Sequence, residues 1–159
     1  MPTEPRPAKI GKILVAVDGS DYAERAGLTA AELAAKYSAE LGILHVADYP
    51  PNVLGVGSTH TVPVGIPMSD PDVDRQRKRA LDSIERIEAF ASRLGIEANS
   101  EIVQTSDSIS DRIADYAYRE NIDLIVAGNL GLNSYQTSLL GSVSNGILNK
   151  ARCSVLVVR

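Results

Sequence analysis

Residues 123–144 read DLIVAGNLGLNSYQTSLLGSVS, and the rest of the chain can be interpreted outward from this stretch. It begins as a short apolar run and carries the glycine pattern G-x-x-G-x9-G over Gly128, Gly131 and Gly141. A pattern of helical spacing follows from Ser142. Glycine lets a ligand approach the backbone, and the first N–H groups of a helix lack internal partners and point at an anion. The stretch therefore predicts a strand, a glycine loop and a helix N-terminus that bind phosphate.

The remaining chain alternates apolar runs with patterns of helical spacing. The apolar runs predict buried parallel strands at residues 12–17, 40–46, 97–104, 123–127 and 154–158. The helical patterns predict helices at residues 21–39, 72–94 and 142–151, and one more helix capped by Ser106 or Asp107. Ser20 or Asp21 is expected to cap the first helix. The alternation predicts one doubly wound, Rossmann-like α/β domain, with a five-stranded parallel sheet and four helices on both faces.

Two segments do not follow this alternation. Residues 1–9 are polar and contain three prolines, which predicts a flexible leader. Residues 47–71 contain five prolines and three glycines and have almost no periodicity. A connection of this length without periodicity is typical of functional or disordered loops, so we expect a mobile insertion there. The predicted domain covers residues 10–159.

The composition narrows the classes of function. The chain has 159 residues, of which 44% are hydrophobic, as expected for one globular domain. A net charge of −4 argues against a general nucleic-acid-binding surface. The single cysteine excludes an internal disulfide and fits a reducing compartment, and no apolar run approaches the ~18 residues of a membrane span. We expect a cytoplasmic protein with neither a nucleic-acid nor a membrane partner.

Ligands of open parallel sheets bind beyond the carboxyl ends of the strands, and three such ends carry suitable residues. Asp18 follows the first strand and could accept from a ribose hydroxyl or an adenine amine, although it could instead cap a helix. Val46 ends the second strand and could pack against a base, although core packing explains it as well. Ser142 and Ser144 could donate to phosphate oxygens or cap the last helix.

The expected phosphate loop lacks a cation of its own. Between Gly128 and Asn149 the sequence has no lysine or arginine. The charge of a phosphate would have to be met by backbone amides, the helix dipole and a cation such as Mg²⁺. This predicts modest, metal-dependent affinity.

No set of residues indicates catalysis. The sequence has no Walker A loop, no serine-hydrolase elbow and no evident pair of base and nucleophile. His45 is expected to be a core residue, and Cys153 is expected to be buried and inert. The expected helix 72–94 has a basic face that is either a solvated surface or a site for an anionic partner, and it consists of Arg75, Arg77, Lys78 and Arg79.

Five segments in sequence order resemble the universal stress protein family, and specifically its ATP-binding branch. They are ILVAVDGS at 13–20, LHV at 44–46, DLIV at 123–126, G-x-x-G-x9-G-S at 128–142 and VLVV at 155–158. The resemblance implies an adenine nucleotide alpha hydrolase-like fold. The basic residue that relatives often carry within the nine-residue spacer is absent here.

The resemblance also implies a ligand and its contacts. ATP or another adenine nucleotide, with Mg²⁺ bound only through its phosphates, would lie between the first and fourth strands. The implied contacts are Ala16, Val17, Asp18, Val46, Ala127, Gly128, Leu130, Gly131, Gly141, Ser142, Val143 and Ser144. A homodimer is implied as well, through antiparallel pairing of the last strand at Val155, Leu156, Val157 and Val158. An unpaired apolar edge strand would otherwise be exposed.

The resulting hypothesis is a homodimeric regulatory protein of the stress response that binds ATP and hydrolyses little or none of it. Two alternatives stay open. One is a dimeric interaction module that binds no nucleotide, and the other is a slow ATPase.

Overall fold

Each helix of this fold connects two parallel strands. The computed structural model describes residues 8–48, 71–132 and 140–159. In these ranges the elements are β1 (Lys12–Ala16), α1 (Asp21–Tyr37), β2 (Glu40–Ala47), α2 (Pro71–Arg93), β3 (Ala98–Gln104), α3 (Ile109–Arg119), β4 (Leu124–Gly128), α4 (Ser142–Lys150) and β5 (Ser154–Val158). The predicted alternation is confirmed, and apart from the start of α3 the predicted ends differ by at most two residues.

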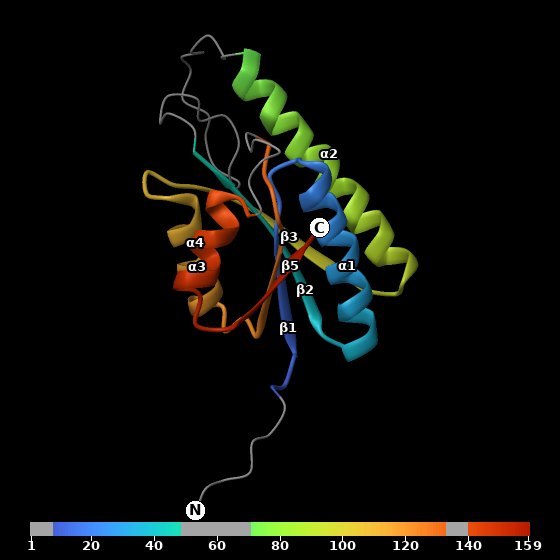
Figure 1. Cartoon of the computed structure of the whole chain (residues 1–159). Helices are drawn as coiled ribbons and strands as arrows, with labels where there is room; N and C mark the ends of the chain where they lie inside the picture. The colour runs from blue at the N-terminus through green and yellow to red at the C-terminus, as the bar shows by residue number, and fades with distance from the viewer. Residues whose placement is uncertain (1–7, 49–70, 133–139) are drawn as a thin grey trace, which may run out of the picture.

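The strands form one parallel sheet in the order β3-β2-β1-β4-β5. Figure 1 shows α1 and α2 on one face of this sheet and α3 and α4 on the other. This arrangement confirms the doubly wound α/β architecture, with helices on both faces.

The strand order reverses at β1, which pairs with β2 on one side and β4 on the other. At the carboxyl end of β1, Ala16 lies opposite Leu44 of β2 and Ala127 of β4. The chain leaves β1 toward one face of the sheet and leaves β4 toward the other, which opens a crevice between the two connections.

The central strands β1 and β4 are buried on both faces, which explains their continuous apolar sequences. Ile13 and Val15 of β1 enter a core with α1 and α2, whereas Leu14 enters a second core with α3 and α4. In β4, Val126 belongs to the first core and Ile125 to the second. Strands covered in this way lose the alternation of polar and apolar residues that marks a half-exposed sheet.

Side-chain caps set the starts of two helices. Ser20 caps α1, as predicted, and its Oγ accepts from the N–H of Ala23 at 3.1 Å. The cap predicted for α3 was wrong, because Ser108 caps this helix by accepting from Asp111 N–H at 3.1 Å. Thr105 Oγ1 accepts from the N–H of Asp107 at 3.0 Å, and this turn delays the start of the helix.

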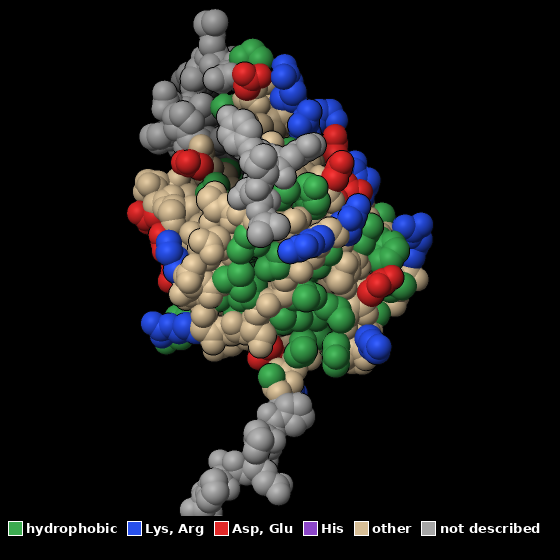
Figure 2. Space-filling view, in the orientation of Figure 1, with side chains coloured by type: hydrophobic (Ala, Val, Ile, Leu, Met, Phe, Trp, Pro, Cys, Tyr) green, Lys and Arg blue, Asp and Glu red, His purple; other side chains and the backbone are tan. Residues whose placement is uncertain are grey.

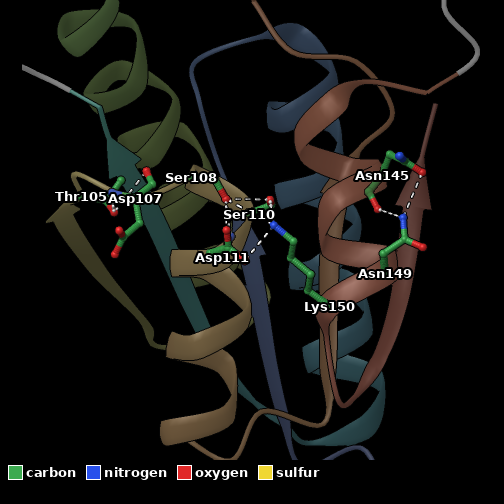
Figure 3. Close-up of polar contacts among 8 residues, drawn as sticks. All are labelled: Thr105, Asp107, Ser108, Ser110, Asp111, Asn145, Asn149 and Lys150. Atoms are coloured by element: carbon green, nitrogen blue, oxygen red, sulfur yellow. Dashed lines mark hydrogen bonds and ion pairs between the residues drawn. The ribbon is translucent and has the colours of Figure 1, made fainter.

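Polar contacts join α3 to α4 (Figure 3). The Lys150 ammonium lies 2.7 Å from Asp111 Oδ1 and 3.4 Å from the hydroxyls of Ser108 and Ser110. The Lys150 ammonium and the Ser108 hydroxyl, which both donate to the Asp111 carboxylate, lower its pKa. A Cβ at Gly146 would lie 2.3 Å from Ser110 Oγ, so the two helices approach closely there. These contacts fix α4, whose first turn lines the crevice described below.

The predicted leader and insertion lie almost entirely outside the described residues. At the ends of the predicted insertion, Ala47 belongs to β2 and Pro71 begins α2. No helix within the described ranges is long and apolar enough to cross a membrane.

Candidate functional site

A cleft of about 430 Å³ lies at the carboxyl ends of β1, β2 and β4. All twelve residues predicted for the site line it, namely Ala16, Val17, Asp18, Val46, Ala127, Gly128, Leu130, Gly131, Gly141, Ser142, Val143 and Ser144. Three segments far apart in the sequence therefore meet at the point where the strand order reverses. A cavity of this volume is within the usual range for small-molecule sites, roughly 300–1,000 Å³.

Asp18 joins the turn after β1 to the glycine loop. Its Oδ1 accepts from the N–H of Ser20 at 2.9 Å, and its Oδ2 accepts from the N–H of Leu132 at 3.0 Å. The helix-capping role considered for Asp18 belongs to Ser20 instead. The carboxylate thus stabilises the turn and at the same time holds the segment after Gly131 at the cleft.

Packing against α1 requires a glycine at position 128, which the sequence did not reveal. A Cβ on this residue would lie 2.7 Å from the carbonyl carbon of Tyr22 and 2.9 Å from the nitrogen of Ala23. These are backbone atoms in the first turn of α1, which cannot move aside easily. The absence of a side chain at Gly128 therefore allows α1 to lie against the end of β4, whether or not a ligand approaches there.

Asn129 connects the glycine loop to two further elements. Its N–H donates to Val158 O of β5 at 2.9 Å, and its carbonyl accepts from Gly141 N–H at 2.6 Å. The side chain is 8% exposed. These two peptide groups fix the distance between the end of β4, the last strand and the start of α4.

The N-terminus of α4 lines the cleft. The N-cap is Gly141, which provides no side-chain hydrogen bond, so the predicted alternative role of Ser142 or Ser144 as the cap is wrong. The first three N–H groups of the helix, from Ser142 to Ser144, have no acceptor within the helix. The Ser144 hydroxyl is buried and donates to Gly128 O, whereas Ser142 is exposed. Backbone amides are therefore the main donors at this end.

Part of the cleft wall is apolar. Val46 is buried there, and Leu44, Ile109 and Ile113 also line this wall. Such a surface can pack against the face of a flat heterocycle.

His45 is a core residue, as predicted, but it also lines the cleft. The carbonyl of Val17 can only accept, so His45 Nδ1 donates to it, over 2.8 Å. Burial lowers the pKa of His45, against the smaller opposing effects of the Val17 carbonyl and the Asp18 charge. The neutral imidazole ties β2 to the turn that carries Asp18.

Sequence reasoning did not assign Asp48 and Gln76 to the site, although both line the cleft. Asp48 lies two residues after Val46, so its position beyond the same strand end was a usable signal. Gln76 lies on α2, which the sequence separates from β2 by the long predicted insertion. No pattern in the sequence indicates which turn of α2 reaches the cleft.

Cations are missing from the cleft lining as far as the structure describes it, although Asp18 and Asp48 both contribute to that lining. Figure 2 shows blue Lys and Arg side chains gathered on the side where Figure 1 places α2. Two of the four predicted basic residues pair within this helix, Arg75 with Asp72 at 3.2 Å and Lys78 with Asp82 at 2.7 Å. This pairing favours the interpretation of a solvated helix face.

The described residues contain no cluster of three or more histidine, cysteine or acidic side chains that could hold a metal ion. Cys153 is half-buried rather than buried, and burial raises the pKa of its thiol. The reactive thiolate is disfavoured there, which agrees with the prediction that this cysteine is inert.

The architecture and the cleft define a doubly wound α/β protein with a glycine-lined site at its strand-order reversal. The family model described as "Universal stress protein family" matches residues 9–159, and the chain belongs to this family. Universal stress protein YxiE of Bacillus subtilis is 33% identical over 150 residues, which cover 93% of this chain and 98% of that protein. A universal stress protein of Thermus aquaticus is 31% identical, covering 92% of this chain and 97% of its own.

Solved structures of the family share the fold. Universal stress protein UspA from Lactobacillus plantarum superposes with a TM-score of 0.73 at 28% identity, covering 96% of this chain and all of that one. A universal stress protein crystallised in complex with cAMP gives a TM-score of 0.69 at 24% identity, covering 96% of this chain and 99% of its own. An Arabidopsis thaliana family member with AMP bound gives a TM-score of 0.60 at 19% identity, and the match covers 93% of this chain and 90% of that one.

Proposed function

We propose that this chain is a regulatory protein that binds an adenine nucleotide in the cleft, either ATP with Mg²⁺ or another adenine nucleotide. The observation that carries this proposal is the composition of one cleft from two different surfaces. The apolar wall around Val46 suits a base, and the unpartnered amides of the first turn of α4 suit a phosphate.

The residues present fit a nucleotide along the length of the cleft. Asp18 lines the same cleft as the apolar residues and the first turn of α4, and its carboxylate can accept from a ribose hydroxyl. Solved structures of family members in complex with cAMP and with AMP bound share this fold, which supports an adenine nucleotide as the ligand class. Mg²⁺ would supply charge neutralisation through the phosphates.

We further propose that hydrolysis is slow or absent. Asp18 accepts from two backbone amides, and the Nδ1 proton of His45 is donated to Val17 O. The Ser144 hydroxyl donates to Gly128 O. Asp18, His45 and Ser144 of the described lining are therefore engaged in holding the cleft, and this engagement supports slow or absent hydrolysis.

The proposed assembly is a homodimer that acts in the stress response in the cytoplasm. β5 lies at the edge of the described sheet, where it pairs with β4 on one side and with no described strand on the other. Its Leu156 is 36% exposed, and edge strands with apolar side chains tend to pair. Antiparallel pairing of two β5 strands would cover this edge in both subunits.

The decisive experiment combines co-purification with titration. The purified protein is denatured, and the supernatant is resolved on an anion-exchange column to detect a released nucleotide. Calorimetry with Mg-ATP at millimolar concentration follows, on the wild type and on Gly131→Val, which places a branched side chain in the cleft lining. We expect a released adenine nucleotide and a binding heat that Gly131→Val abolishes; absence of both in the wild type contradicts the proposal.

The same variants distinguish the interaction-module alternative. If this alternative holds, Gly131→Val leaves function intact, while Arg77→Glu with Arg79→Glu abolishes capture of the protein partner. Steady-state phosphate release that disappears in Asp18→Ala would instead support a slow ATPase.

A further inference from the structure

The charge of the cleft differs from that of a typical polyphosphate site. Two carboxylates, Asp18 and Asp48, belong to its lining, and no lysine or arginine does among the residues that the structure describes. The sequence of residues 49–70 and of residues 133–139 contains no lysine or arginine either. The described lining therefore supplies no cationic side chain.

Three basic side chains of α2 and α4 are engaged in ion pairs. Gln76 is the α2 residue that lines the cleft, and two cations of the same helix pair with acidic neighbours, Arg75 with Asp72 and Lys78 with Asp82, whereas Arg77 and Arg79 lie outside the described lining. On α4, Lys150 lies in the last turn and pairs with Asp111 of α3. None of these three cations belongs to the described lining of the cleft.

The positive end of the cleft is small. It consists of the backbone amides from Ser142 to Ser144 and the N-terminal end of the α4 dipole, which is equivalent to roughly half a positive charge. Three amides and half a charge suit one phosphate group. Each additional phosphate would add negative charge to a cleft that already contains two carboxylates, and that charge would find no counter-ion in the described lining.

We infer that the cleft selects adenine nucleotides by net negative charge: it prefers a nucleotide with a single phosphate, and it binds ATP more tightly as the magnesium complex than as free ATP. This inference rests on the proposed function, because it specifies the ligand class of the same cleft. Free ATP carries about four negative charges, whereas its magnesium complex and AMP each carry about two. Removal of Mg²⁺ should therefore weaken ATP binding and leave AMP binding unchanged.

The first part of the test measures dissociation constants of AMP and ATP by calorimetry, each with Mg²⁺ and with EDTA. We expect AMP to bind equally in both buffers and ATP to bind at least about ten-fold more weakly in EDTA, the size expected for two uncompensated charges in a partly enclosed site. Because added salt screens these charges, the ATP penalty should shrink as ionic strength rises.

The second part of the test adds a positive charge to the cleft lining. Gln76→Lys places an ammonium on the α2 turn that lines the cleft, and both residues have similar helix propensity. The variant should tighten Mg²⁺-free ATP by roughly three- to ten-fold and AMP by a smaller factor. Gln76→Met, which has similar length and no charge, is the matched control and should leave the ratio of the two affinities unchanged.

The outcomes separate this inference from the proposed function. Equal affinity of AMP and ATP in EDTA would overturn the charge selection and leave nucleotide binding intact. An unchanged ratio of AMP affinity to ATP affinity in Gln76→Lys would overturn it as well, since a charge in the cleft lining would then have no influence on phosphate binding. Failure of every nucleotide to bind the wild type would overturn the proposed function and, with it, the inference.

Discussion

Asp18 shows how one side chain can serve the fold and the cleft together. Its two oxygens accept from Ser20 and Leu132, which lie on opposite sides of the crevice. A ligand hydroxyl that donates to Asp18 must share an oxygen that already holds the backbone. The sequence indicated that Asp18 lies at the site, but not that it bridges two loops, because Leu132 is more than a hundred residues away.

Replacement of this carboxylate should therefore affect stability as well as binding. In Asp18→Asn an amide NH₂ would face one of the two backbone N–H donors, so one hydrogen bond is lost and one donor is left unpaired. We expect the free energy of unfolding to fall by about 1–3 kcal/mol, measured by urea denaturation. Asp48→Asn is the control, since Asp48 is an exposed residue, and it should shift stability by less than about 0.5 kcal/mol.

His45 makes stability depend on pH in a defined direction. Burial lowers its pKa in the folded state below the ordinary value of 6.5, so the unfolded chain binds more protons at mildly acid pH. The contribution of neutral His45 is complete above pH 6.5 and is lost as the pH falls from there through the folded pKa. Urea midpoints measured between pH 7.5 and 5 should fall less steeply in His45→Gln than in the wild type.

His60 provides the comparison for this measurement. It is the only other histidine of the chain, so a His60→Gln variant retains His45. A slope reduced equally by both substitutions would contradict the assignment to His45.

At the scale of helices and strands, the sequence predicted what depends on local pattern. The central strands were found because they are covered on both faces and are therefore apolar, as Ile13, Leu14 and Val15 of β1 show. The start of α3 was misplaced because the Thr105 turn competes with the helix, and three neighbouring polar residues offered similar caps. Gln76 was missed because the approach of α2 to the cleft is set by tertiary packing.

Gly128 tests the contact between α1 and β4. In Gly128→Ala the added methyl group would meet the backbone of Tyr22 and Ala23, and one of the two elements must shift. We expect a loss of about 1–3 kcal/mol in the free energy of unfolding, as for other overpacked sites, together with weaker nucleotide binding. Thermal and urea denaturation measure the first effect.

Gly11→Ala is the matched control for this substitution. A Cβ at Gly11 would lie 3.5 Å from Asp123 Oδ2, which is an ordinary contact distance. Its stability should stay within about 0.5 kcal/mol of the wild type. Equal effects of the two substitutions would show that the contact with α1 is not the cause.

At the scale of the whole molecule, the two edges of the sheet are unequal. The β3 edge carries polar side chains that bond to neighbouring helices, Ser100 to Glu88 of α2 and Glu101 to Tyr116 of α3. The β5 edge ends in an apolar strand with Leu156 partly exposed. This difference favours the β5 edge for the proposed association of two subunits.

A charge on β5 should dissociate the proposed dimer. Leu156→Lys places an ammonium on the edge strand, so sedimentation velocity should detect monomers for this variant and dimers for the wild type. Leu148→Lys on α4 is the control, because Leu148 is 46% exposed and lies outside β5. A wild-type monomer, or a dimer that survives Leu156→Lys, would contradict the proposed interface.

The two backbone hydrogen bonds of Asn129 have a thermodynamic consequence. Asn129 joins the last strand to the start of α4. A ligand that displaces Asn129 would therefore displace Val158 as well. Ligand affinity and subunit affinity would then be linked, and each would alter the other by the same factor. Dilution that dissociates the subunits would then lower the affinity for the ligand. The fraction of sites occupied at a given ligand concentration would therefore depend on the protein concentration.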